Sequence, residues 1–129
     1  GELSRISLAI QVITSKIGTA PTLIFDEVDA GIGGRVAEIV GAMLKKLGEE
    51  RQVMCVTHLA QVASAADQQW QVVKSADPAN GGKITSRITV LDQQQRIEEI
   101  ARMLGGVKIT ETTRQHAAEM LQMQSQSKG

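Results

Sequence analysis

Residues 22–27 read TLIFDE, a short and mostly apolar run that ends in two adjacent carboxylates. A continuous run of this kind fits a central strand of a parallel sheet, covered on both faces, better than an edge strand. Residues 52–56 read QVMCV and form a second such run, which leads into Thr57 and His58. We therefore expect two buried strands, each followed directly by polar side chains.

Helical patterns flank both predicted strands. Apolar residues recur at helical spacing in residues 3–17 and 36–47, and Gly48 is suited to end the second of these helices. A short helix is expected over residues 59–66. Alternation of helices and strands predicts an α/β fold with parallel strands, in which ligands bind beyond the carboxyl ends of the strands.

The second half of the chain has a different pattern. Strand-like runs at residues 70–73 and 84–91 flank the polar stretch DPANGG at residues 77–82, which predicts a β-hairpin. Helices are expected over residues 93–104 and 111–123. The whole chain therefore predicts parallel strands with flanking helices, plus a small β-hairpin.

Composition limits the possible functions. Fourteen basic and fourteen acidic residues cancel, so the chain has no net electrostatic attraction to DNA or to an anionic membrane. Phe25 and Trp70 are the only aromatic residues, which argues against a surface that stacks single-stranded bases. The sequence contains neither a leader pattern nor an apolar run long enough to span a membrane, so the cytoplasm is the expected location.

Asp26 and Glu27 form the first candidate site. Neighbouring side chains on an extended strand point in opposite directions, so the two carboxylates can act on different targets. Asp26 is a candidate ligand for Mg²⁺, which prefers oxygen donors. Glu27 is a candidate general base that orients and deprotonates the water attacking a phosphate. The alternative is that the pair only caps a helix at a strand-to-helix turn.

His58 follows the neighbouring strand and is expected on the same rim as Asp26 and Glu27. From there it could hydrogen-bond a γ-phosphate oxygen or position the attacking water. The alternative is a structural histidine with satisfied hydrogen bonds. His116 lies in a polar stretch of the last predicted helix, and we expect it to be a solvated surface residue.

Two further segments contain glycine at positions suited to ligand binding. Gly1 and Glu2 precede a predicted helix, whose first unpaired N–H groups could bind an anion. A simple helix cap, with Glu2 complementing the helix dipole, is the alternative. The glycines within residues 28–34, VDAGIGG, allow close approach of the backbone to a ligand, or else form only a flexible turn.

The order and spacing of these segments resemble the second half of an ABC-type ATPase head. The resemblance rests on GELSR, a helix, TLIFDEVD and VTH, in that order. In such heads the order is signature motif, Walker B, D-loop and switch histidine. By this resemblance Gly1 and Glu2 end the signature motif, Asp29 belongs to the D-loop, and His58 is the switch histidine.

Finer details are similar to the RecN family of bacterial double-strand-break repair proteins. Transporter ATPases usually have proline after the Walker B glutamate, whereas this chain has Val28. Residues 29–34 (DAGIGG), 55–63 (CVTHLAQVA) and 101–106 (ARMLGG) look specifically like RecN. The family usually has proline where this chain has Ala60, which should loosen the turn after the histidine slightly.

The resemblance implies that residues 1–129 are the C-terminal part of the head, and that the Walker A loop and coiled-coil arms would precede Gly1. It implies ATP and Mg²⁺ as cofactors, with each ATP held between two heads of a homodimer. The intact protein would hydrolyse ATP and hold DNA in the bacterial nucleoid, with no membrane partner. This chain alone is expected to be inactive.

Three other interpretations stay open. The chain could belong to another ABC-type head, from a transporter or another SMC-like protein. It could be a stand-alone magnesium phosphohydrolase that uses Asp26, Glu27, Asp29 and His58 without a Walker A loop. It could also be a fragment without catalytic activity that only dimerises. The upstream sequence or hydrolysis by the chain alone would discriminate among these.

Overall fold

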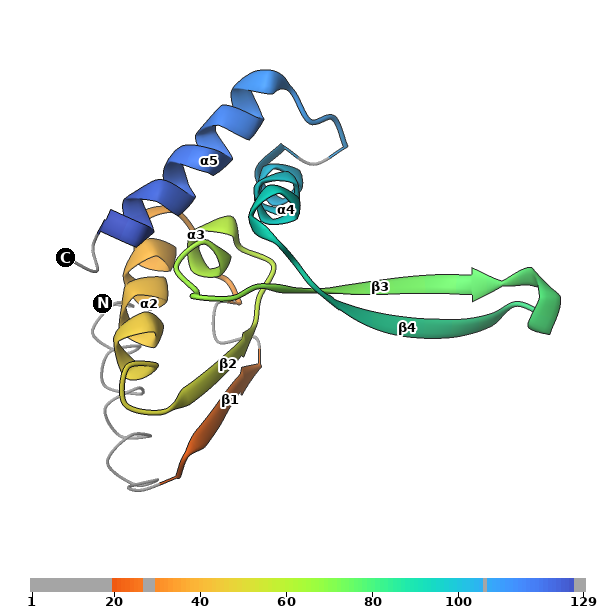
Figure 1. The fold of residues 1–129 in the computed structure, drawn as a ribbon, viewed down its shortest axis with the longest axis horizontal. Coiled ribbons are helices and arrows are strands. Elements are labelled where there is room, and N and C mark those ends of the chain that lie inside the picture. Colours follow the sequence, from red (N-terminus) through yellow and green to blue (C-terminus); the bar gives the residue numbers. More distant parts are fainter. Residues whose placement is uncertain (1–19, 27–29, 106, 127–129) are drawn as a thin grey trace. The chain divides into compact units, whose positions relative to one another are not determined.

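The computed structural model describes residues 20–26, 30–105 and 107–126 (Figure 1). The expected helix over residues 3–17 lies outside these ranges. The chain divides into two compact units, Gly1–Ala66 and Asp67–Gly129. The first unit contains β1 (Thr22–Asp26), α2 (Gly34–Leu47), β2 (Gln52–Val56) and α3 (Ala60–Ala63). The second contains β3 (Trp70–Asp77), the 3₁₀ turn η1 (Pro78–Asn80), β4 (Lys83–Val90), α4 (Gln93–Gly105) and α5 (Glu111–Gln126).

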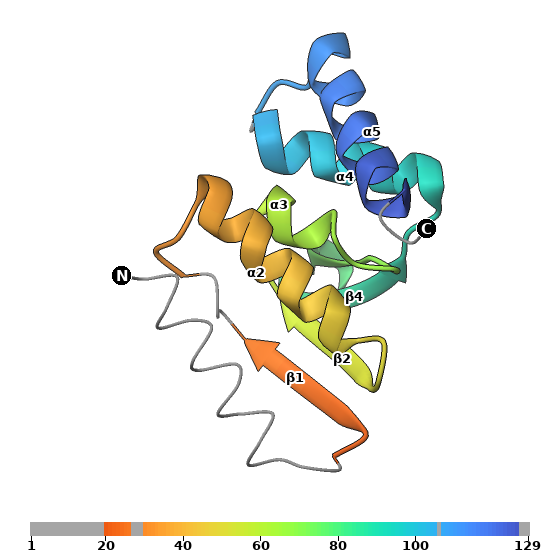
Figure 2. The same ribbon diagram turned by 90° about the vertical axis from the view of Figure 1, so that its left-hand side faces the viewer.

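β1 and β2 form a parallel sheet in the first unit, as the sequence predicts. Their register runs from Thr22 opposite Gln52 to Asp26 opposite Val56. Helix α2 connects the two strands and lies beside them (Figure 2). The carboxyl ends of both strands therefore lie at the same edge of the sheet, which confirms the α/β fold with parallel strands.

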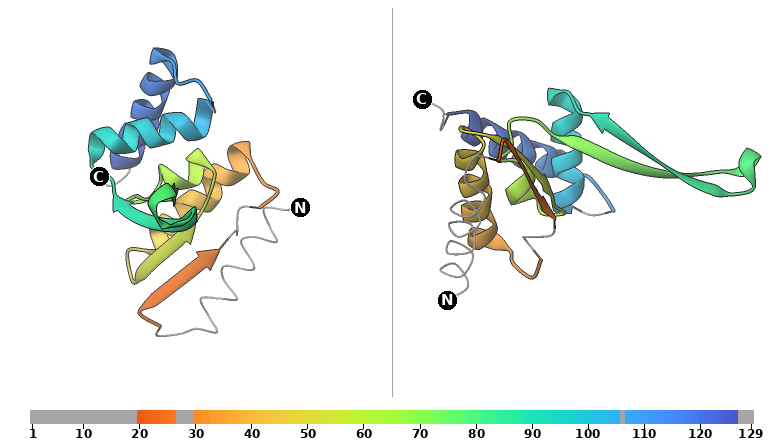
Figure 3. Two further views of the ribbon diagram at one scale, coloured as in Figure 1. Left: turned by 90° about the vertical axis from the view of Figure 1, so that its right-hand side faces the viewer. Right: turned by 90° about the horizontal axis from the view of Figure 1, so that it is seen from below.

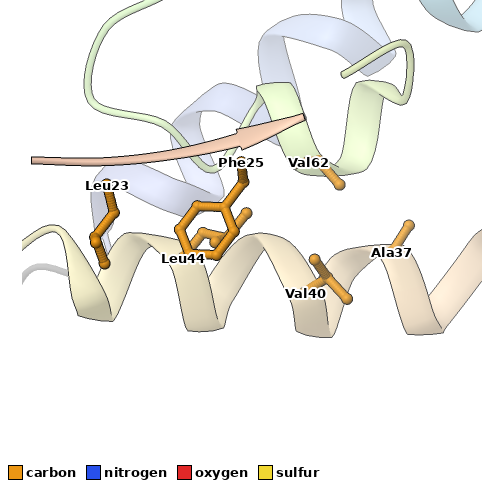
Figure 4. Packing of buried hydrophobic residues seen from close by; sticks show 6 residues of the cluster. All are labelled: Leu23, Phe25, Ala37, Val40, Leu44 and Val62. Carbon is orange, nitrogen blue, oxygen red and sulfur yellow. The ribbon is translucent and has the colours of Figure 1, made fainter. Parts of the chain in front are cut away.

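The core of this unit lies between the sheet and the helices. Leu23 and Phe25 point from β1 toward α2 (Figure 4). They belong to one buried cluster with residues from α2 and α3, namely Ala37, Val40, Leu44 and Val62. Burying such side chains stabilises the fold by about 1.5–3 kcal/mol for each large one.

The opposite face of the sheet differs from the prediction. Ile24 is 69% exposed and Val56 is 58% exposed, whereas Leu23 and Phe25 are buried. The expectation that both faces are covered is therefore wrong for β1 in the described structure, whereas the inner residues of β2 are half-buried. A continuous apolar run cannot reveal that α2 and α3 pack on only one face, and the strand alternates between buried and exposed positions.

Glycines set the limits of α2. Gly31 and Gly34 have φ values of +77° and +54°, which residues other than glycine rarely adopt. These two glycines lie in the turn that leads into the helix. Gly48 ends the helix as predicted, and its N–H donates to the Leu44 carbonyl at 3.0 Å. Its φ of −69° is right-handed, so the ending does not need the left-handed conformation that glycine allows.

Helix α3 is shorter than the expected span of residues 59–66. Only Ala60–Ala63 are helical, although turn hydrogen bonds continue as far as Ala66. The helix packs closely on α2 at Gly41, because a Cβ atom there would lie 2.9 Å from the Gln61 carbonyl oxygen. It would also lie 3.0 Å from Cβ of Ala65. Gly41 is therefore required for this close approach.

β3 and β4 form the predicted antiparallel hairpin, paired from Trp70 opposite Val90 to Asp77 opposite Lys83. The hairpin extends away from α4 and α5 of the same unit (Figure 3). At its turn, the Asp77 carboxylate accepts from the Ala79 N–H at 2.9 Å and from Nδ2 of Asn80 at 3.1 Å. This turn joins two strands, so its glycine–lysine sequence is not a phosphate-binding loop.

A buried carboxylate ties α4 to the base of the hairpin. Glu99 accepts from Nε2 of Gln71 at 2.8 Å and from the Arg102 guanidinium at 2.6 and 2.9 Å. Helix α5 is joined to α4 by an ion pair of 2.7 Å between Arg114 and Glu98. These contacts satisfy the charge of Glu99, whose burial would otherwise be costly.

Candidate functional site

The candidate site lies at the carboxyl ends of β1 and β2. Asp26 is the last residue of β1 and stands opposite Val56, the last residue of β2. His58 follows Val56 by two residues, and both Asp26 and His58 are exposed. The sheet thus brings the carboxylate and the turn that carries the imidazole to one edge, as the sequence predicts.

A short turn joins β2 to α3 and carries His58. Oγ1 of Thr57 accepts a hydrogen bond from the Leu59 N–H at 3.0 Å, so the bond joins the two residues on either side of His58. The Leu59 carbonyl then accepts from the N–H groups of Val62 and Ala63 at 3.1 and 3.0 Å. Within the part of the chain that the structure describes, no residue hydrogen-bonds the His58 side chain.

Four of the six predicted site residues lie outside the described residues. These are Gly1, Glu2, Glu27 and Asp29. Their predicted roles in binding the nucleotide and activating water stay predictions. His116 is exposed on α5, which agrees with the surface position expected for it.

Asp26 is suited to a magnesium ion that is shared with a bound phosphate. Mg²⁺ is commonly held by one or two carboxylates together with waters and substrate phosphates, and it seldom has an all-protein cage. Residues 20–26, 30–105 and 107–126 contain no group of three side chains that could hold a metal ion by themselves. The exposed carboxylate of Asp26 fits the shared arrangement, in which a bound phosphate would supply further oxygen ligands.

Two residues that shape this site have roles that the sequence alone does not reveal. Thr57 contributes the hydroxyl that holds the turn, and Gly41 allows α3 to approach α2. A threonine two residues before a helix cap is a known turn signal, and it could have indicated the first of these. Nothing local in the sequence marks Gly41, because its neighbours come from another helix.

None of the described helices is both long and apolar enough to cross a membrane.

The chain is similar over nearly all of its length to several bacterial proteins named DNA repair protein RecN. The relative from Vibrio cholerae is 54% identical over 121 residues, which is 94% of this chain and 21% of the relative. The Haemophilus influenzae relative is 50% identical over 95% of this chain and 22% of its own length. The Bacillus subtilis relative is 41% identical over 99% of this chain and 22% of its own length. The chain thus spans about a fifth of the length of each of these relatives. No protein-family model matches it.

A solved structure has a similar fold. It comes from work on ATP-driven dimerization and DNA-stimulated activation of SMC ATPases, and it superposes with a TM-score of 0.61 at 20% identity. The match covers 79% of this chain and 59% of that structure. At this identity the likeness supports the fold alone. Sequence identity of 41–54% over at least 94% of the chain is much more specific, and it shows that this chain is homologous to a segment that makes up about a fifth of the RecN proteins.

Proposed function

We propose that this chain is the C-terminal part of an ATP-hydrolysing head in a bacterial DNA repair protein. In the intact protein, two such heads would bind ATP and Mg²⁺ between them, and their engagement would control how the protein holds broken DNA. The relatives named for DNA repair and the fold shared with an SMC ATPase both support this proposal.

One observation carries the proposal. Asp26 and the His58 turn follow two adjacent parallel strands at the same edge of the sheet. This is the edge at which α/β proteins bind their ligands. His58 is exposed and has no hydrogen-bond partner among the described residues, which supports a role toward a ligand over a purely structural one.

The proposed roles follow from the chemistry of each side chain. Asp26 holds the magnesium ion through an oxygen ligand. Glu27, the next residue along the chain, orients and deprotonates the attacking water. His58 donates a hydrogen bond to the γ-phosphate, where negative charge must be stabilised during transfer. The bound magnesium ion would supply further compensation of that charge.

Gly1, Glu2 and Asp29 are proposed to act across the interface between two heads. Backbone N–H groups at the start of the helix after Gly1 and Glu2 would bind the nucleotide of the partner head. Hydrolysis would then require two heads. The fourteen basic and fourteen acidic residues of this chain give it no net attraction to DNA. DNA binding is therefore proposed for the intact protein, in the cytoplasm.

The proposal is tested on the intact protein. We expect magnesium-dependent ATP hydrolysis whose specific rate rises with protein concentration, together with a doubling of the mass in light scattering when ATP is added. A specific rate independent of concentration, with no change in mass, would contradict the two-head mechanism. Robust hydrolysis by residues 1–129 alone would instead favour a stand-alone phosphohydrolase, since this chain contains no Walker A lysine.

A further inference from the structure

The turn that carries His58 is fixed at both of its ends. At the start, Val56 is held by its place opposite Asp26 in the parallel sheet. At the other end, α3 is held against α2, where Gly41 leaves no room for a side chain beside the Gln61 carbonyl. Only residues 57–59 connect the end of β2 to the start of α3. The backbone conformation at His58 therefore depends on the contacts that these three residues make.

The hydroxyl of Thr57 supplies a hydrogen bond inside this interval. Its Oγ1 accepts from the Leu59 N–H at 3.0 Å and closes a small ring around His58. Leu59 is the N-cap of α3, with φ of −100° and ψ of 125°, and its own side chain makes no cap hydrogen bond. The backbone N–H of this cap is therefore satisfied by the residue before the histidine.

We propose that Thr57 is a positioning residue for His58. Its hydroxyl fixes the backbone on both sides of the histidine, so that the imidazole is held toward the nucleotide before the nucleotide binds. This inference rests on the proposed function of His58. Positioning of this kind matters because small displacements of a catalytic group lower the rate strongly.

Thr57→Val isolates the hydroxyl, since valine keeps the branched shape and removes the acceptor. Without that acceptor, the Leu59 N–H should exchange with deuterium about three- to tenfold faster, as expected for the loss of one hydrogen bond. Thr57→Ser keeps the hydroxyl and should restore slow exchange. Fragmentation mass spectrometry that resolves the Leu59 amide measures this in the intact protein without nucleotide.

Thr22→Val is the matched control. Thr22 lies at the other end of β1, and its hydroxyl also makes a side-chain hydrogen bond, to Oε1 of Gln52 at 3.0 Å. The same substitution there should change neither Leu59 exchange nor hydrolysis. An equal effect of both variants would show a general loss of stability and would overturn the proposal.

Hydrolysis by the intact protein gives the second measurement. We expect Thr57→Val to lower kcat by about three- to tenfold with little change in KM for ATP, because it disturbs a positioned group. Thr57→Ser should recover the rate. In a His58→Ala background, Thr57→Val should have no further effect, since a residue that acts through His58 has nothing left to position.

The outcomes separate this inference from the proposed function. If His58→Ala lowers hydrolysis while Thr57→Val leaves both Leu59 exchange and kcat unchanged, the histidine acts but Thr57 does not position it. If Thr57→Val lowers kcat equally with and without His58, Thr57 acts by another route and the inference is wrong. If His58→Ala hydrolyses ATP at the normal rate, the proposed role of the histidine itself fails.

Discussion

Asp26 stands directly opposite Val56 in the parallel sheet, and His58 follows Val56 by only two residues. A carboxylate and an imidazole that are 32 positions apart in the sequence thus emerge at one edge of the same two strands. Both side chains are exposed there, so neither is needed to fill the core. This arrangement allows the two groups to be tested by substitutions that should leave the fold intact.

We expect His58→Ala to lower ATP hydrolysis by the intact protein by about a hundredfold or more, as for other positioned groups that stabilise a transition state. The thermal midpoint should hardly change, because substitutions at exposed positions usually alter stability by less than about 0.5 kcal/mol. His116→Ala, also at an exposed position, is the matched control and should leave both quantities unchanged. A large fall in the midpoint with normal specific activity would identify His58 as structural.

Asp26→Asn should raise the magnesium concentration needed for half-maximal hydrolysis. The amide keeps the shape of the side chain but lacks the negative charge that makes a carboxylate a good ligand for a hard cation. Titration of hydrolysis with Mg²⁺ at fixed ATP measures the effect. Glu38→Gln, which removes an exposed carboxylate from α2, is the control. Identical magnesium dependence in the two variants would argue against metal binding by Asp26.

Glu27→Gln should separate nucleotide binding from hydrolysis. Glutamine keeps the size of glutamate but cannot accept a proton from water, so hydrolysis should stop while ATP still binds. Two heads that cannot hydrolyse their ATP should stay engaged, which light scattering detects as a lasting increase in mass. Normal turnover by this variant would rule out Glu27 as the general base.

Much of the first unit could be predicted from local pattern. The short apolar runs that end at Asp26 and Val56 identify both strands, and the polar residues that follow them mark the candidate site. The exposure of Ile24 could not be predicted in this way. An apolar run indicates strand formation, but which face is covered depends on helices that pack from elsewhere in the chain.

The hairpin illustrates a second limit. The apolar pattern predicts that β3 ends at Val73, yet the strand continues to Asp77. Lys74 and Ser75 are not strand-forming by pattern, but each is paired with a residue of β4, and the Ser75 and Thr85 hydroxyls lie 3.3 Å apart. Pairing across the hairpin therefore extends the strand beyond what its own sequence indicates.

Two effects of replacing Gly41 oppose each other, because this residue lies at the close contact between α2 and α3. Gly41→Ala raises intrinsic helix propensity, which by itself would stabilise α2 by about 0.5–1 kcal/mol. The new Cβ would, however, lie 2.9 Å from the Gln61 carbonyl oxygen, a backbone atom that cannot rotate away. Overpacking of this kind costs about 1–3 kcal/mol, so the steric term should exceed the gain in propensity.

Hydrogen–deuterium exchange of the intact protein can measure the balance within α2 and α3. If the free energy of local unfolding falls by about 1 kcal/mol, amides that exchange through local opening should exchange roughly fivefold faster. Gly33→Ala is the control, because no atom lies within 4 Å of a Cβ at that position and its φ of −164° is accessible to alanine. It should cost no more than the modest preference for glycine over alanine at a helix N-cap. Slower exchange of α3 in Gly41→Ala than in the unsubstituted protein would mean that helix propensity outweighs the contact, and that α3 can move from α2 without cost.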